Sequence, residues 1–172
     1  MKKLILLTSA LSIAATLYLN QPSNINTKDE TAAINTLLND WHAAAGKAYY
    51  NAYFDKMATD GYYIGTDATE NWATQAFAAY AKPYFDRGKA WNFKTLERHV
   101  FFSKDRKTAW FDELLDTQMK ICRGSGVLEK EGKVWKVKHY VLSMTVPNEV
   151  SKEVIPIKAK YEDALIEKLR VK

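Results

Sequence analysis

The chain has 172 residues, a length that suits one domain and leaves no room for two full ones. Apolar residues make up 47% of it and charged residues 26%, which excludes a disordered chain and indicates an ordinary globular domain. The formal net charge of +5 is small, and basic residues are interleaved with acidic ones, so the charge does not indicate a nucleic-acid-binding protein. The single cysteine, Cys122, excludes an intramolecular disulfide and a cysteine-based metal site.

The first residues have the order of a secretory signal. Lys2 and Lys3 precede an uncharged, mostly apolar stretch at 4–19, and polar residues follow from Asn20. This order predicts a signal peptide at 1–22. An uncleaved N-terminal anchor is the alternative, although the apolar stretch is shorter than the roughly 20 residues that span a bilayer. Either interpretation places the domain outside the cytoplasm, in the periplasm or secreted, with no other membrane contact expected.

Two helical stretches are predicted next. A capping-box pattern begins at Thr27, and apolar residues then recur at helical spacing as far as Met57, with Gly46 as a point of division. A short extended piece is expected at 62–66. A second helix is predicted over 73–87, where Pro83 should kink the helix or tighten its last turn.

A long antiparallel meander is predicted after the helices. Its four strands cover residues 91–103, 108–119, 122–130 and 133–146. In the last strand, lysines alternate with apolar and aromatic residues, which indicates one wet face and one packed face. The residues expected on the packed face are Trp135, Val137, His139 and Val141. Residues 150–170 have a helical pattern that Pro156 interrupts.

Helices followed by a run of strands indicate an α+β domain. We expect a curved antiparallel sheet to wrap around the N-terminal helices and to leave a cavity between them. The domain is predicted at 28–148, and residues 149–172 are predicted as a C-terminal helical extension.

Several short stretches resemble the SnoaL-like domain family of the nuclear-transport-factor-like superfamily. They are residues 63–70, 88–91, 109–113, 122–128, 135–137, 142–143 and 147–148. The resemblance implies a cone-shaped α+β fold with an aromatic-lined pocket. It implies little about activity, because the superfamily includes isomerases, dehydratases, cyclases and non-catalytic binding domains. Val141 departs from the resemblance, since relatives often carry a polar side chain there.

The adjacent carboxylates Asp112 and Glu113 must point to opposite faces of their strand. Asp112 shares its face with Trp110, which favours Asp112 as the carboxylate inside the pocket. Arg123 on the next strand would bind a ligand carboxylate or pair with Asp112. A carboxylate in an aromatic pocket would have a raised pKa and could act as a general base. The resemblance implies this role, because ketosteroid isomerases of the same superfamily use such a carboxylate. A purely structural ion pair between Asp112 and Arg123 is the alternative.

His139 is the candidate partner of Asp112 in proton transfer, although a histidine satisfied by one hydrogen bond inside the core is the default interpretation. The histidines lack metal-ligand spacing, so neither a metal site nor a cofactor is predicted. Aromatic side chains with a polar tip suit a pocket wall. The candidate ligand-binding aromatic residues are Trp41, Tyr53, Tyr63, Trp72 and Trp110.

The leading functional prediction is an exported pocket domain that binds a small, mostly apolar molecule without catalysing a reaction. The alternative is an isomerase or dehydratase that uses Asp112 and His139 for proton transfer. A second alternative is a structural or partner-binding protein that forms a homodimer through its sheet.

Overall fold

The computed structural model describes residues 27–171, and the predicted signal peptide lies outside the described residues. The elements follow one another as α2 (Thr27–Gly46), α3 (Tyr50–Phe54), β1 (Met57–Ile64), β2 (Asn71–Ala73), α4 (Thr74–Asp86), β3 (Lys94–Phe102), β4 (Thr108–Thr117), β5 (Lys120–Glu131), β6 (Val134–Met144), the short 3-10 helix η1 (Asn148–Val150) and α5 (Ser151–Arg170). The α+β class is therefore confirmed, and the four predicted strands of the meander are β3 to β6.

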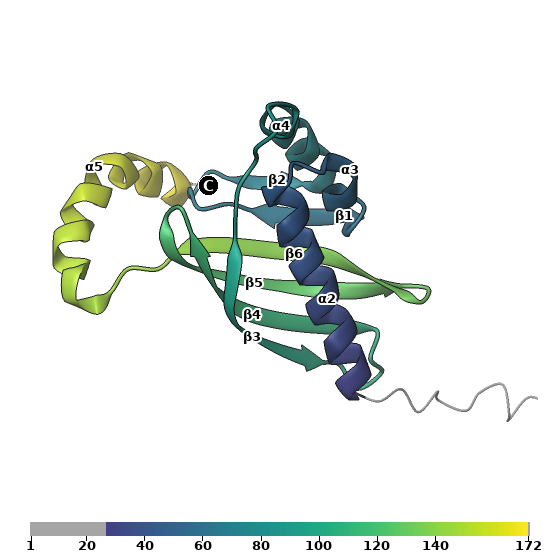
Figure 1. Ribbon diagram of the computed structural model, residues 1–172. Coiled ribbons are helices and arrows are strands. Elements are labelled where there is room, and N and C mark those ends of the chain that lie inside the picture. The colour runs from purple at the N-terminus through teal and green to yellow at the C-terminus, as the bar shows by residue number, and fades with distance from the viewer. Residues whose placement is uncertain (1–26, 172) are drawn as a thin grey trace, which may run out of the picture. The chain divides into compact units, whose positions relative to one another are not determined.

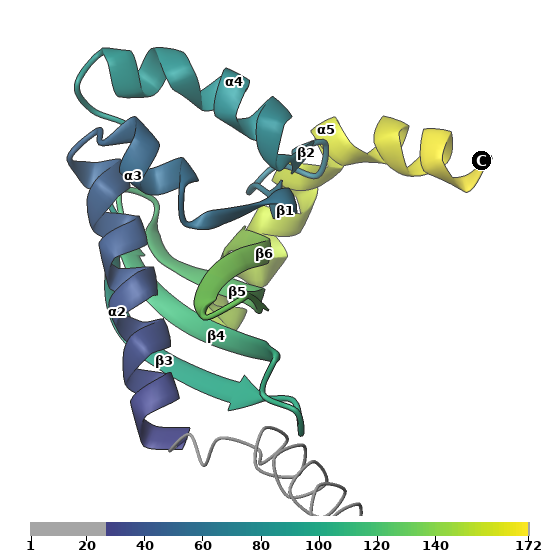
Figure 2. The same cartoon turned by 90° about the vertical axis from the view of Figure 1, so that its right-hand side faces the viewer.

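The six strands form one curved, unclosed sheet in the order β2-β1-β6-β5-β4-β3 (Figure 1; Figure 2). Four of the five strand pairs are antiparallel, but β1 pairs with β6 in parallel, with Tyr63 opposite Tyr140. The sheet is therefore mixed rather than purely antiparallel. The predicted helix ran to Met57, yet Met57 begins β1, because pairing with a distant strand overrides the local helical pattern.

Gly46 divides the first helical stretch as predicted, since α2 ends there and α3 begins at Tyr50. From Ile34 onward α2 crosses the inner face of the sheet, where Ile34, Leu38 and Trp41 are fully buried (Figure 1; Figure 2). This spacing of three and four residues places their side chains on one side of the helix.

Aromatic rings fill the space between the helices and the inner face of the sheet. Trp41 stacks on Tyr53 with ring centroids 5.0 Å apart, and its edge meets Tyr140 at 4.8 Å. Tyr63 stacks on Phe77 of α4 at 3.9 Å. The expected aromatic-lined cavity is thus occupied at this point by the rings themselves, which pack as core.

A β-bulge in β6 changes which side chains face inward. Val127 of β5 pairs with His139, whereas the next residue pairs with Val137, so Lys138 is an extra residue in β6. An extra residue shifts the alternation of faces by one position. Trp135 and Val137 are buried as predicted, but after the bulge Tyr140 faces inward and His139 faces outward. The expected packed-face positions of His139 and Val141 are therefore wrong.

α5 has no buried residue and contacts mainly the adjoining η1. Pro156 lies inside the helix without ending it. Among residues 27–171, no helix has both the length and the apolar composition that a membrane span requires.

Candidate functional site

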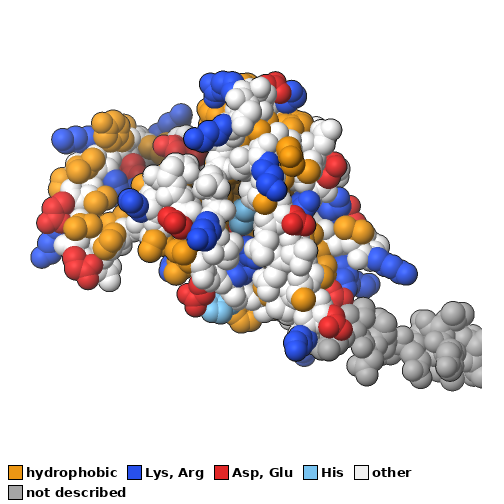
Figure 3. Space-filling model, in the orientation of Figure 1, with side chains coloured by type: hydrophobic (Ala, Val, Ile, Leu, Met, Phe, Trp, Pro, Cys, Tyr) orange, Lys and Arg blue, Asp and Glu red, His pale blue; other side chains and the backbone are white. Residues whose placement is uncertain are grey.

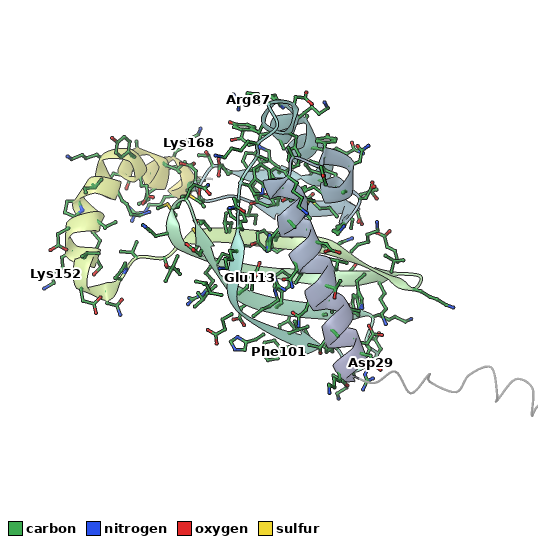
Figure 4. All side chains as sticks on the ribbon, viewed as in Figure 1. Asp29, Arg87, Phe101, Glu113, Lys152 and Lys168 are labelled. Atoms are coloured by element: carbon green, nitrogen blue, oxygen red, sulfur yellow. The ribbon has the colours of Figure 1, made fainter. Side chains whose placement is uncertain are left out.

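Glu113 lies on the inner face of β4 and is 1% exposed. Arg98 of β3 donates to its Oε2 from Nε at 2.9 Å and from Nη2 at 2.6 Å. The other carboxylate oxygen of Glu113, Oε1, accepts hydrogen bonds from Nε2 of His42 at 2.8 Å and from the hydroxyl of Tyr140 at 3.1 Å. Three elements, α2, β3 and β6, thus converge on one carboxylate, which Figure 4 labels.

Gly124 of β5 makes room for this arrangement. It lies opposite Glu113 in the β4–β5 register. A Cβ atom at position 124 would clash with the Tyr140 hydroxyl and would lie 2.8 Å from Oε1 of Glu113. The absence of a side chain at position 124 therefore allows the hydroxyl to reach the carboxylate.

The side chain of Arg98 is 4% exposed and links β3 to α2. Besides Glu113, its guanidinium donates to Oδ1 of Asn39 at 2.9 Å and to Oγ1 of Thr95 at 2.9 Å. It also donates to the backbone carbonyl of Asn35 at 3.3 Å. The planar fork of the guanidinium is thus used on both sides, which holds α2 at a fixed position over β3 and β4.

These contacts set the charge state of Glu113. Burial acts to raise the pKa of the Glu113 carboxyl, but hydrogen bonds from His42 and Arg98 and the positive charge of Arg98 outweigh it and hold that pKa below its ordinary value. Burial, and then the nearby Glu113 carboxylate, raises the pKa of the Tyr140 hydroxyl well above its usual range, so Tyr140 remains a donor. Glu113 is therefore an ionised acceptor whose oxygens are already occupied, and it is poorly suited to be a general base.

His42 is held by this carboxylate and is 3% exposed. Because ionised Glu113 only accepts hydrogen bonds, Nε2 of His42 carries the proton. Within residues 27–171, no hydrogen bond is recorded for the other ring nitrogen, Nδ1. Phe93 meets the imidazole edge on with centroids 5.8 Å apart. The structure thus presents an oriented imidazole with one nitrogen left for another partner.

His42 belongs to the lining of a groove of about 1060 Å³, and Figure 3 shows a hollow beside α2. One wall is the second half of α2, and the other is residues 88–98, which lead from α4 into β3. We call it the α2 groove. Its lining residues are Asn35, Asn39, His42, Ala43, Gly46, Lys47, Gly88, Lys89, Trp91, Asn92, Phe93, Lys94, Thr95, Leu96, Glu97 and Arg98.

The predicted site residues on the sheet lie on its outer face. Trp110 is 47% exposed and stacks on Phe101 of β3, with ring centroids 6.0 Å apart. The Asp112 carboxylate is half-exposed and lies 3.0 Å from Nδ1 of His99. This interaction, chiefly the hydrogen bond, raises the pKa of His99 above its ordinary value. The expectation that Asp112 and Trp110 face inward is wrong, because Ala109, Phe111 and Glu113 occupy the inner face of β4.

Arg123 and His139 also lie outside the inner face. Arg123 is exposed and pairs in register with Leu114, not with Asp112. His139 is on β6, which β5 separates from the strand of Asp112. The predicted pairs Asp112–Arg123 and Asp112–His139 are therefore not brought together inside a pocket, while the functional roles of these residues stay predictions.

The other four aromatic candidates lie in or beside the core and not on the outer face of the sheet. Trp41, Tyr53 and Tyr63 are buried in the core. Trp72 is partly buried and stacks on Tyr80 with centroids 4.7 Å apart. None of these four belongs to the lining of the α2 groove.

Three residues of the site were not selected from the sequence: His42, Arg98 and Tyr140. A signal for the fourth, Glu113, was present. Ala109, Phe111 and Leu115 alternate with polar residues in β4, and Glu113 falls in that apolar series.

Within the described part of the chain, no three His, Cys, Asp or Glu side chains form a group that could hold a metal ion.

Comparisons with known proteins agree with this fold. A family model described as "SnoaL-like domain" matches residues 34–147. A search of curated proteins finds no match.

Among solved structures, an NTF2-like protein of unknown function from Pseudomonas putida KT2440 superposes with a TM-score of 0.59 at 16% identity, covering 73% of this chain and 92% of that one. A proposed dehydratase of the NTF2-like family from Streptomyces avermitilis superposes with a TM-score of 0.62 at 8% identity, covering 71% of this chain and 100% of that one. A cystatin-like domain of unknown function from Nostoc punctiforme PCC 73102 gives a TM-score of 0.61 at 13% identity, covering 86% and 99%. At these identities the likeness concerns the fold alone.

Proposed function

Because this chain belongs to the SnoaL-like domain family, we propose that it is a small-molecule-binding domain whose ligand lies in the α2 groove. The observation that carries the proposal is the imidazole of His42, which lines the groove, is fixed by Glu113 through Nε2, and has Nδ1 left for a ligand. A side chain that is already ordered loses little conformational entropy when a ligand binds.

The side chains that line the groove indicate how polar its ligand should be. The interior between helices and sheet is filled by rings, whereas the groove is lined by three asparagines, His42 and charged residues. A mostly apolar ligand remains the prediction, and this lining favours one that also makes hydrogen bonds.

A substitution that fills the groove tests the proposal. Ala43 is exposed on α2 and lines the groove, so Ala43→Trp should block it without disturbing the core. Ala79 is exposed on α4 outside the groove, and Ala79→Trp is the matched control. A fragment library screened by NMR against the full chain should yield compounds that shift the Trp91 indole resonance in the control and not in Ala43→Trp. Identical compound sets for both variants would refute the groove as the binding site.

Proton transfer is a second candidate function, and the His42–Glu113 pair favours it. Nδ1 would take a proton from a bound substrate, and the ionised Glu113 would stabilise the resulting imidazolium. His42→Gln keeps a donor toward Glu113 but removes the base, so turnover of a substrate should fall by about a hundredfold or more while binding is retained. Unchanged turnover in His42→Gln would eliminate this candidate.

Export is also part of the proposal, and residues 1–22 support it with their basic, apolar and polar order. Intact-mass analysis of protein from the native host should show the loss of roughly 14 to 26 N-terminal residues. A full-length product in the cytoplasm would contradict export and leave the binding proposal intact.

A further inference from the structure

Three lysines line the α2 groove, and within the described part of the chain their side-chain ammonium groups have no recorded ion pair or hydrogen bond: Lys47, Lys89 and Lys94. The only acidic residue in the lining is Glu97, and its carboxylate lies 3.2 Å from Nε2 of His99. The field of the lysines is therefore not cancelled locally.

Two further charged residues near the groove, Arg98 and Asp116, bear on its field. Arg98 also lines it, but its guanidinium is bound to the buried Glu113. Asp116 lies opposite Lys94 in the β3–β4 register and makes no recorded ion pair with it among the described residues. An anion that enters the groove would thus meet uncompensated positive charge.

The lysines flank the groove from both walls. Lys47 follows the end of α2 directly, and Lys89 and Lys94 bracket the segment that leads into β3. Positive charges on both sides of a concave surface concentrate an anion between them more effectively than charges on a flat surface.

Apolar surface lies between the lysines. Trp91 and Phe93 line the same wall, in the segment that Lys89 and Lys94 enclose. Asn39 and Asn92 add amide groups. A ligand that satisfies this set has a charged end for the lysines and a flat apolar body for the rings.

We propose that the α2 groove binds a small organic carboxylate with a flat, apolar body. The inference deepens the proposed function and rests on it. The lysines would attract the carboxylate, and the rings of Trp91 and Phe93 would contact the flat body.

The test compares two probes that differ only in charge, naphthoate and its neutral amide, naphthamide. Both are titrated into the full chain, with binding followed through the Trp91 indole resonance. Because three exposed lysines surround the groove, naphthoate should bind about tenfold more tightly than naphthamide at low salt. The preference should shrink as the ionic strength is raised, because exposed charges are screened.

Two triple variants with the same change in net charge separate local from global effects. Lys47→Gln combined with Lys89→Gln and Lys94→Gln should abolish the preference for naphthoate over naphthamide. The control combines Lys104→Gln, Lys120→Gln and Lys133→Gln, all exposed and outside the groove lining, and it should keep the preference.

Equal binding of both probes by the unmodified protein would overturn the carboxylate assignment and leave groove binding standing. A preference lost equally in both triple variants would also overturn it, because net charge alone would then explain the preference. If neither probe shifts the Trp91 resonance, the carboxylate inference fails, whereas the proposed function fails only if the fragment screen gives identical compound sets for Ala43→Trp and Ala79→Trp.

Discussion

Glu113 is a buried anion whose hydrogen-bond donors come from α2, β3 and β6. Removing a carboxylate from water is costly, and only well-placed donors and an opposite charge compensate for it. Here Arg98 supplies the opposite charge, while His42 and Tyr140 satisfy the remaining oxygen. The same residues that hold α2 against the sheet therefore orient the imidazole in the groove, so the stability of the fold and the orientation of His42 depend on one network.

Removing one charged partner from this network should lower the free energy of unfolding. In Glu113→Gln, Arg98 remains buried without its counter-charge, and we expect a loss of about 3–5 kcal/mol in the free energy of unfolding, measured in urea. Asp112→Asn on the outer face is the neighbouring control and should cost less than about 1 kcal/mol. Adding Arg98→Met to Glu113→Gln should cost less than the sum of the two single changes. Additive effects would mean that the two residues are not coupled.

The lowered pKa of Glu113 also predicts how stability depends on pH. Since the folded state keeps this pKa below the value in the unfolded chain, the stabilising contribution is complete above the ordinary glutamate range and is lost as the pH falls through the folded pKa. Melting temperatures recorded from neutral to acidic pH should fall less steeply in Glu113→Gln than in the unmodified protein. Parallel curves would show that Glu113 titrates alike in the folded and unfolded chains.

At the scale of elements, periodicity predicted the helices and the four strands of the meander, because these patterns are local. The faces of two strands were harder to predict. In β4 the aromatic Trp110 suggested the wrong inner face, since the outer face also carries exposed aromatic side chains. In β6 the bulge at Lys138 exchanged the faces of His139 and Tyr140, and no local pattern marks it.

The candidate site was largely hidden from sequence analysis for a related reason. His42, Arg98 and Glu113 come from three elements, and their meeting depends on the path of the sheet. One wall of the groove is mostly non-regular chain at 88–93, which has no periodicity to interpret. The residue types suggested that a pocket exists. Its position could be found only from the tertiary structure, because its walls come from distant parts of the sequence.

α5 should be dispensable for the stability of the fold. It has no buried residue, so ending the chain after Val150 should change the free energy of unfolding of the remainder by no more than about 1 kcal/mol. Ending it after Val141 removes the buried Leu142 and the end of β6, and this shorter chain should fail to unfold cooperatively. A large loss of stability on removing α5 alone would show that it packs on the domain in solution.

At the scale of the whole molecule, the two faces of the sheet have different surroundings. The inner face carries the core and the Glu113 network, whereas the outer face exposes the stacked pair Phe101 and Trp110. Exposed apolar pairs of this kind on a sheet suit contact with another protein surface. Pairing of two copies through the outer face would leave the inner-face network intact, so dimerisation and ligand binding need not compete.

The predicted homodimer can be tested through this pair. Trp110→Ser removes the larger ring of an exposed stack and should shift the sedimentation equilibrium of the protein from dimer toward monomer. The fold should survive, because Trp110 contributes nothing to the inner-face core. Tyr49→Ser, which removes an exposed ring on the helical side, is the matched control and should leave the mass unchanged. If the unmodified protein is monomeric, or if both variants remain dimeric, the exposed pair on the outer face does not hold two copies together.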